Sequence, residues 1–327
     1  MTSVMRPILA AVALTFAFAS APCAQDYPTR PVTMVVPFAA GGPIDVLARI
    51  LGPALGETLG QSVVIENVSG GGGMPASYRV ATAQSDGYQF VLGSIGTHTL
   101  SPLLAKKPLY NPTTDFAPVI LIAEVPLVLM VRKDLPARDL NEFVAYAKAN
   151  HAKMQYGSGG TGTSAHIGCL LLNQAIGVDV IHIPYRGGGP ALGDLIAGRI
   201  DYLCNYISLA VPAVEAGTIR ALATFAKTRS PVMPSLPTTQ EQGLSGIDAY
   251  TWNAIFLPKG TPPAMVARLN AAVSQAMDLP AVRERLKTLG LQIVPKERRT
   301  PDYLRTYLAA EFAKWGPPIK ASGLAEE

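Results

Sequence analysis

Short apolar, β-branched runs alternate with longer segments of helical spacing along most of the chain. The first run spans residues 32–37, and residues 45–59 follow it with apolar side chains at helical intervals. The pattern predicts further strands at 62–66, 88–92, 126–131, 154–156, 178–183, 200–204 and 219–224. It predicts further helices at 75–83, 140–150, 163–175, 190–197, 263–277, 281–289 and 301–314. Strands that alternate with helices are typical of parallel sheets covered by helices on both faces, so we expect an α/β fold.

The alternation occurs in two series, which predicts two lobes. Residues 115–126 are expected to cross from the first lobe to the second, and residues 246–258, which contain Trp252, are expected to return. The first lobe would then comprise residues 25–124 and 250–327. The second would comprise residues 125–249.

The N-terminus carries the pattern of an export signal. Arg6 is the only charged residue in the first 25 positions, and an apolar run over 8–21 follows it. Such a run is short for a helix that spans a bilayer core of about 30 Å, and small residues stand at its end. We therefore expect a signal peptide at residues 1–24 and an exported mature chain; a membrane anchor is the alternative.

Composition narrows the classes of function. The chain has 27 Lys and Arg against 23 Asp and Glu, a net charge of +4, with no basic block, which argues against nucleic acid as a partner. Hydrophobic residues make up 49% of the 327 residues, enough for a sizeable core. Of the three cysteines, Cys169 and Cys204 follow the signal. They can pair in an oxidising compartment, or they can be two small buried apolar residues.

Three glycine-containing loops each leave a predicted strand and enter a helical segment, where parallel α/β sheets bind ligands. Their candidate residues are Phe38, Ala39, Ala40, Gly41, Gly42 and Asp45 in the first loop, Ser94, Thr97 and His98 in the second, and Ser158, Gly160, Thr161, Gly162, Thr163, Ser164 and His166 in the third. Glycine leaves backbone N–H groups open to a ligand, and the start of a helix adds partial positive charge. Together the loops predict a shared site for a carboxylate or phosphate. Ordinary turns with N-capping by Asp45, Thr97 and Thr163 are the alternative.

Nucleotide binding and catalysis have weaker support. Gly157, Gly159 and Gly162 form a G-x-G-x-x-G, but the next strand has Asp179 at its beginning instead of an acid at its end. The four histidines lack metal-binding spacing, so we expect no metal and no cofactor. An exported serine hydrolase that uses Ser158 or Ser164 with His166 stays as the alternative function.

Collinear segments over nearly the whole mature chain carry a resemblance to a known family. They are Tyr27-Pro28-Thr29-Arg30-Pro31-Val32, 36–38 with Gly41, Gly42 and Asp45, 48–49, 59–61, 64–67, the glycine run 70–73, 86–88, 156–158, Gly162, His166, His182-Ile183-Pro184-Tyr185-Arg186-Gly187, 190–191 and Gly198-Arg199-Ile200-Asp201. Together they resemble the Bug-type receptors, the solute-binding component of tripartite tricarboxylate transporters. The resemblance implies a monomeric, two-lobed periplasmic binding protein of the type II, flytrap class, with parallel-rich sheets covered by helices. It also implies a large and a small integral-membrane subunit as partners.

The resemblance also implies a ligand class, small carboxylates that include dicarboxylates, amino acids and aromatic acids. Backbone groups of 38–45 would hold one carboxylate, partly through water, and 158–164 would act from the other lobe. Many relatives have Asp where this chain has Asn205, which favours a second carboxylate or an uncharged tail over an amine.

The side chains around the far end of the ligand stay open at this point. Tyr185, Tyr206 and Trp252 are candidates for an apolar wall, and Arg186 is either a charged clamp or a solvated loop residue. We expect a receptor for a dicarboxylate or an aromatic acid, without catalysis. A chemosensory adaptor is a third hypothesis.

Overall fold

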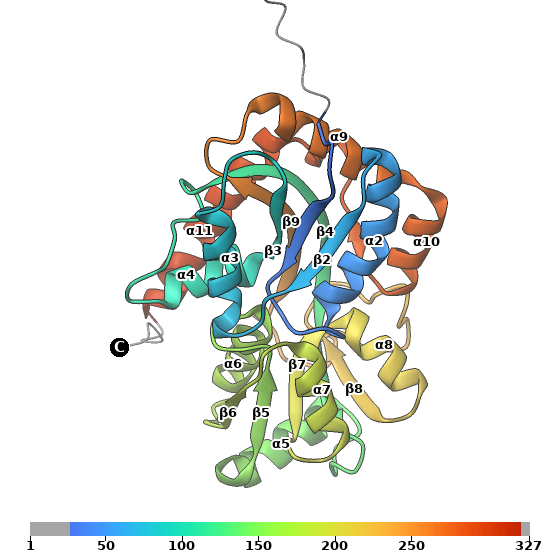
Figure 1. Ribbon diagram of the computed structural model, residues 1–327. Helices are drawn as coiled ribbons and strands as arrows, with labels where there is room; N and C mark the ends of the chain where they lie inside the picture. Colours follow the sequence, from blue (N-terminus) through green and yellow to red (C-terminus); the bar gives the residue numbers. More distant parts are fainter. Residues whose placement is uncertain (1–26, 322–327) are drawn as a thin grey trace, which may run out of the picture.

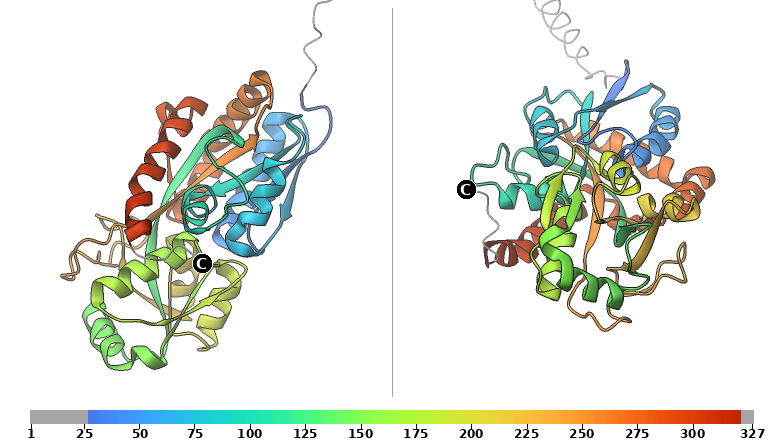
Figure 2. Two further views of the ribbon diagram at one scale, coloured as in Figure 1. Left: turned by 90° about the vertical axis from the view of Figure 1, so that its left-hand side faces the viewer. Right: turned by 90° about the horizontal axis from the view of Figure 1, so that it is seen from below.

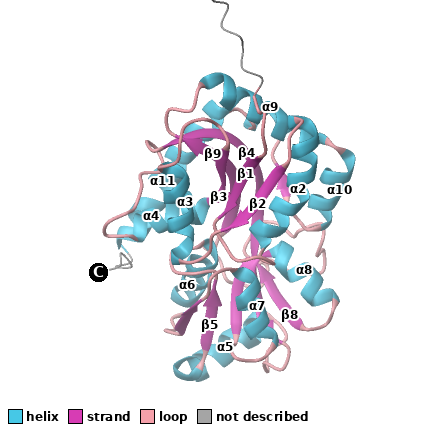
Figure 3. Ribbon diagram, in the orientation of Figure 1, coloured by secondary structure: helices cyan, strands magenta, loops and turns pink. Residues whose placement is uncertain are grey.

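The computed structural model describes residues 27–321, so the signal peptide expected at 1–24 lies outside the described residues. Two lobes of sheet and helices lie one above the other (Figure 1). Their strands form one mixed sheet in the order β2-β1-β3-β9-β4-β7-β5-β6, with β8 and β10 also paired to β4. The secondary-structure colouring shows helices beside the strands of each lobe (Figure 3). This is the α/β architecture that the alternating pattern predicts.

The first lobe is built on three parallel strands whose order places β1 in the middle. These strands are β1 (Val32–Val36), β2 (Val63–Asn67) and β3 (Gln89–Ser94), and β9 (Tyr250–Pro258) pairs antiparallel with β3. The helices of this lobe are α2 (Pro43–Leu59), α3 (Met74–Ala81), α4 (Ser101–Leu104), α9 (Pro263–Asp278), α10 (Pro280–Thr288) and α11 (Pro301–Ala321). Strand β1 is almost wholly buried, as a central parallel strand must be.

The second lobe repeats the scheme with shorter strands. Its parallel strands are β5 (Gln155–Ser158), β6 (Ile181–Pro184) and β7 (Tyr202–Tyr206), and β8 (Ile219–Thr224) pairs antiparallel with β4. Its helices are α5 (Leu140–Asn150), α6 (Ser164–Ile176), α7 (Gly188–Ile196) and α8 (Ile207–Glu215). Each of α6, α7 and α8 begins within a few residues of the end of a strand, so their N-termini face the first lobe.

One long strand connects the lobes. Strand β4 (Phe116–Arg132) pairs with β9 through its first part and with β7 and β8 through its last part (Figure 2). The crossover expected at 115–126 is therefore part of a continuous strand. Pro118 and Pro126 interrupt the strand pattern in the sequence, and a register shift in the pairing with β9 follows Pro118. The limits of the two lobes stay a prediction, because β4 belongs to both.

Several elements were not predicted, among them the helix α8 and the strand β9, which lies in the expected return at 246–258. A π-helical turn (Gly96–Leu100) follows β3 and leads into α4, and a two-residue strand, β10 (Gln292–Ile293), pairs with β4. Short 3₁₀ turns occupy Gly71–Gly73, His151–Lys153 and Lys296–Arg298. None of the described helices is both long and apolar enough to cross a membrane.

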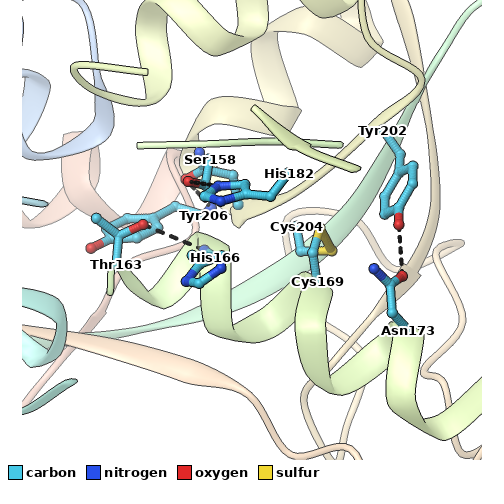
Figure 4. The surroundings of a disulfide bond; sticks show 10 residues. Ser158, Thr163, His166, Cys169, Asn173, His182, Tyr202, Cys204 and Tyr206 are labelled. Carbon is cyan, nitrogen blue, oxygen red and sulfur yellow. Dashed lines mark hydrogen bonds between the residues drawn. A yellow bond between two sulfur atoms is a disulfide. The ribbon is translucent and has the colours of Figure 1, made fainter. Parts of the chain in front are cut away.

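A disulfide decides the question that the sequence left open about Cys169 and Cys204. The two sulfur atoms are bonded, and both residues are completely buried (Figure 4). The bond joins the second turn of α6 to β7, one residue before Asn205. It therefore fixes two elements whose ends point toward the other lobe.

Candidate functional site

A small cavity of about 30 Å³ lies where the two lobes meet. Its lining from the first lobe is Phe38, Pro43, Ile44 and Ser94, and from the second lobe Gly159, Thr163, Ser164, Ala165, Gly188, Asn205 and Tyr206. None of these side chains carries a charge. An ion held here would therefore depend on hydrogen bonds and backbone dipoles.

Four helices begin at this cavity. Pro43 and Ile44 open α2, Ser164 and Ala165 open α6, and Gly188 opens α7. Tyr206 is the residue directly before α8. The first N–H groups of a helix have no acceptor within the helix, and the helix dipole places partial positive charge there. The cavity is thus a site for a negatively charged or acceptor-rich group.

Asp45 holds the first loop through hydrogen bonds and does not line the cavity. Its Oδ2 accepts hydrogen bonds from Gly41 N and Arg49 Nε, both at 2.9 Å, and its Oδ1 accepts from Asn67 Nδ2 at 2.9 Å. Burial would raise the pKa of Asp45, but these donors, Arg49 first, lower it below its ordinary value. In this structure Asp45 supports the loop, and its role as a ligand contact stays a prediction. Gly41 and Ala40 are exposed on its outer side.

The loops of the two lobes touch each other. Ala39 N donates a hydrogen bond of 3.0 Å to the carbonyl oxygen of Arg186. A Cβ atom added to Gly189 would lie 3.0 Å from Gly41 C, so the two backbones pass closer than side chains would allow. The lobes are therefore closed around the cavity.

The third loop is held by hydrogen bonds of its own. Thr163 is the N-cap of α6: its hydroxyl accepts from His166 N and donates to Gly160 O. His166 Nδ1 accepts from Gly162 N, and its ring stacks on His182 with 4.2 Å between centroids. Burial lowers the pKa of His166 to about 4. The imidazole is therefore neutral at pH 7 and serves the shape of the loop.

The serine–histidine pair of the hydrolase hypothesis is not formed. Ser158 Oγ lies 2.7 Å from His182 Nε2, a different histidine, and accepts from Gly160 N (Figure 4). Ser158 is fully buried and is absent from the cavity lining. Ser164 does line the cavity, but it lies at the start of the helix that carries His166, whose Nδ1 is already bonded to Gly162.

Other predicted residues lie away from the cavity. His98 is completely buried and stacks on Phe256 at 4.0 Å, and Thr97 bonds to His98 Nδ1 and to Ser94. The helical turn at 96–100 directs these side chains into the core of the first lobe, and neither lines the cavity; ligand contact by them stays a prediction.

Tyr185 and Arg186 also point elsewhere. Tyr185 donates to Asp194 Oδ2 at 2.7 Å. Arg186 is exposed and lines a separate groove of about 640 Å³, together with Gly160, Thr161 and Gly162. Both hypotheses for Arg186, a charged clamp and a solvated loop residue, stay predictions. Trp252, a candidate for the wall, is buried and donates to Glu311.

Five predicted residues line the cavity, and several lining residues were missed. The five are Phe38, Ser94, Thr163, Ser164 and Asn205, and Tyr206 forms wall as expected. The missed residues are Pro43, Ile44, Gly159, Ala165 and Gly188. Gly187–Gly189 also follow a strand and open a helix, so the reasoning applied to the first three loops would have found this fourth one.

The family follows from comparison with known proteins. Residues 47–324 match the family model described as "Tripartite tricarboxylate transporter family receptor". The chain belongs to this family. This receptor is 33% identical over 324 residues to Protein BugT of Bordetella pertussis. The matched region covers 98% of each chain. It is 38% identical over 301 residues to a protein of Agrobacterium vitis, with 92% of this chain and 87% of the relative covered.

Solved structures confirm the two-lobed periplasmic binding-protein fold of the receptor. MatC of Rhodopseudomonas palustris, with bound malate, is 42% identical with a TM-score of 0.87 over 90% of this chain and all of that chain. The periplasmic binding protein BugD is 35% identical with a TM-score of 0.89 over 92% and 100%. An R. palustris protein with adipate is 36% identical with a TM-score of 0.87 over 91% and 99%. The receptor is thus a periplasmic solute-binding protein of the Bug type.

Proposed function

We propose that this receptor captures a small carboxylate, a dicarboxylate or an aromatic acid, between its lobes. It then delivers the ligand to a tripartite membrane transporter with a large and a small integral-membrane subunit. The observation that carries the proposal is the convergence of four helix starts on a cavity that no charged side chain lines. Partial positive charge without a fixed counter-ion suits an anion.

Asn205 supports the same ligand class. Its Oδ1 accepts from Tyr206 N at 2.8 Å, which fixes the orientation of the amide. Its Nδ2 lies close to Gly188, since a Cβ on that glycine would be 2.9 Å away, and it remains a donor. A donor here favours a carboxylate oxygen, whereas an ammonium group would find no acidic side chain in the lining.

Closure between the lobes supports a role in delivery. The contact from Ala39 to Arg186 exists only when the lobes are together, so a membrane partner that recognises the closed form selects the loaded receptor. Malate and adipate, the ligands bound in two similar structures, are both dicarboxylates. We propose that the receptor acts as a monomer, without catalysis.

Calorimetry on the mature chain tests the proposal. Malate, adipate and benzoate are titrated, with succinamide as a neutral control for the carboxylate. We expect at least one acid to bind at a 1:1 ratio with no turnover, and succinamide not to bind. Binding of succinamide alone would overturn the proposal. Uptake measured separately from signalling in a deletion strain then separates transport from the adaptor hypothesis.

A further inference from the structure

A strip of polar side chains on one face of the sheet reaches the cavity at Ser94. Ser94, the last residue of β3, pairs in register with Asn253 of β9, so the two side chains lie side by side on the same face. Thr251 lies two residues earlier on β9 and shares that face. Its hydroxyl donates to the Tyr206 hydroxyl at 3.0 Å, which brings the end of β7 over the strip. Ser94 and Tyr206 both line the cavity.

Two donors of this strip lack acceptors. Ser94 and Asn253 are each 1% exposed, and neither Ser94 Oγ nor Asn253 Nδ2 has a hydrogen-bond partner within the described part of the chain. Buried polar atoms without partners are uncommon and are usually explained by a bound group or water. Ser94 lines the cavity and Asn253 lies beside it on the next strand, so we place the missing acceptor in the cavity or in water next to it.

The surroundings of Tyr206 show an excess of donors over acceptors. Burial raises the pKa of Tyr206, and four polar side chains near its hydroxyl oppose that rise: Thr251, which is hydrogen-bonded to it, and Ser164, Ser94 and Asn253. One phenol oxygen has two lone pairs at most and already accepts from Thr251. A carboxylate brings two oxygens and about four lone-pair sites, which matches the remaining donors.

We propose that Ser94 and Asn253, together with Tyr206, form a second subsite that binds a carboxylate where the strip reaches the cavity. The inference rests on the proposed function, in which the helix starts hold the first carboxylate. The receptor then prefers a dicarboxylate to an acid of equal length with one carboxylate. An aromatic acid with a single carboxylate would leave these donors unsatisfied, which disfavours it.

Neutral donors make the subsite selective. Within the described residues the strip contains no lysine or arginine, so the second carboxylate is bound by hydrogen bonds alone. A ligand that ends in a methyl group offers no acceptor to Ser94 Oγ or Asn253 Nδ2. When such a ligand binds, both donors stay buried without a hydrogen-bond partner. Discrimination between such ligands by a site built to form hydrogen bonds is large, on the order of tenfold or more.

Titration with succinate and butyrate tests the subsite, because these acids share four carbons and differ in the second carboxylate. We expect the wild-type receptor to bind succinate at least about tenfold more tightly than butyrate. In Ser94→Ala and Asn253→Ala this ratio should fall toward one, while the affinity for butyrate is retained. Thr99→Val is the matched control: Thr99 is also buried with an unpartnered hydroxyl, but it lies in the helical turn after β3, outside both the strip and the cavity lining, so the ratio should not change.

The outcomes separate the two proposals. Equal affinities for succinate and butyrate in the wild-type receptor would overturn the subsite but not the proposed function. In that case an ordered water would be the partner of Ser94 and Asn253. Failure of every carboxylate to bind overturns the proposed function itself. A preference for succinate that survives both substitutions also contradicts the subsite. The wild-type ratio keeps the inference testable if a variant fails to fold.

Discussion

The backbone amide of Ala39 donates a hydrogen bond to the carbonyl oxygen of Arg186, and the two residues come from opposite lobes. The bond lies where the loop after β1 meets the loop after β6. Because neither side chain takes part, closure here depends on the path of the backbone. Ligand affinity is consequently linked to every contact that brings the lobes together.

The glycine run should be required for closure. Gly72 has φ +62°, and an added Cβ would lie 2.4 Å from Thr161 O of the other lobe. We expect Gly72→Ala to favour the open form and to weaken carboxylate binding by about tenfold or more. Gly70→Ala is the control, because Gly70 also has positive φ but an added Cβ would meet nothing within 4 Å. Calorimetry with small-angle scattering measures both effects, and an equal loss in the two variants would contradict a role in closure.

Asn205 should decide the charge of the ligand. We expect Asn205→Asp to place a negative charge at the cavity and to weaken binding of a dicarboxylate by roughly 100-fold at pH 7.5. Asn205→Ala adds no charge and removes the donor together with the acceptor of Tyr206 N, so its loss should be nearer tenfold. Dissociation constants for both variants check the order. If the Asp and Ala variants bind equally well, electrostatics at this position is not decisive.

The disulfide should stabilise the second lobe. It closes a segment of 35 residues, and loop-closure entropy then contributes about 4 kcal/mol to the free energy of unfolding. Thermal and urea unfolding of the Cys169→Ala/Cys204→Ala double variant should show a loss of this size. A loss below about 1 kcal/mol would show that packing alone holds α6 on β7.

Acid should destabilise the fold through His98. Burial lowers the pKa of His98 to about 3, whereas an unfolded chain has a histidine pKa of about 6.5. The unfolded state therefore binds more protons between these values, so this contribution is complete above pH 6.5 and is lost as the pH falls. The expected slope is about 1.4 kcal/mol per pH unit for one ring.

Urea unfolding at several pH values between 7.5 and 4.5 checks this slope. His98→Asn removes the titrating ring, so its stability should depend less on pH. The Asp45 carboxylate does not interfere, because its lowered pKa confines its contribution to more acidic solutions. An unchanged slope in the variant would show that His98 does not titrate with folding.

Local features of the sequence predict most of the strands and helices and the position of two loops at the cavity, but they did not predict α8 or β9. Helical spacing and glycine after a strand were sufficient for the loops around Phe38 and Ser164, because both features act within a few residues. Strand β4 was missed as one element because Pro118 and Pro126 interrupt its pattern, and only pairing with β9 keeps it continuous.

Side-chain directions could not be predicted in the same way. His98 turns inward because a π-helical turn follows β3, and nothing in the spacing of Gly96 to Leu100 indicates that turn. Arg186 is a candidate clamp by its position after β6; its carbonyl contacts Ala39, and its side chain is exposed beside the outer groove. These outcomes depend on tertiary contacts between distant segments.

A crystal structure of the receptor with a bound dicarboxylate tests the central claim most directly. We expect one carboxylate within hydrogen-bonding distance of the first N–H groups of α2 and α6, inside the cavity that Ile44, Ser164 and Asn205 line. A dicarboxylate bound instead in the outer groove beside Arg186, with the cavity unchanged, would contradict the account.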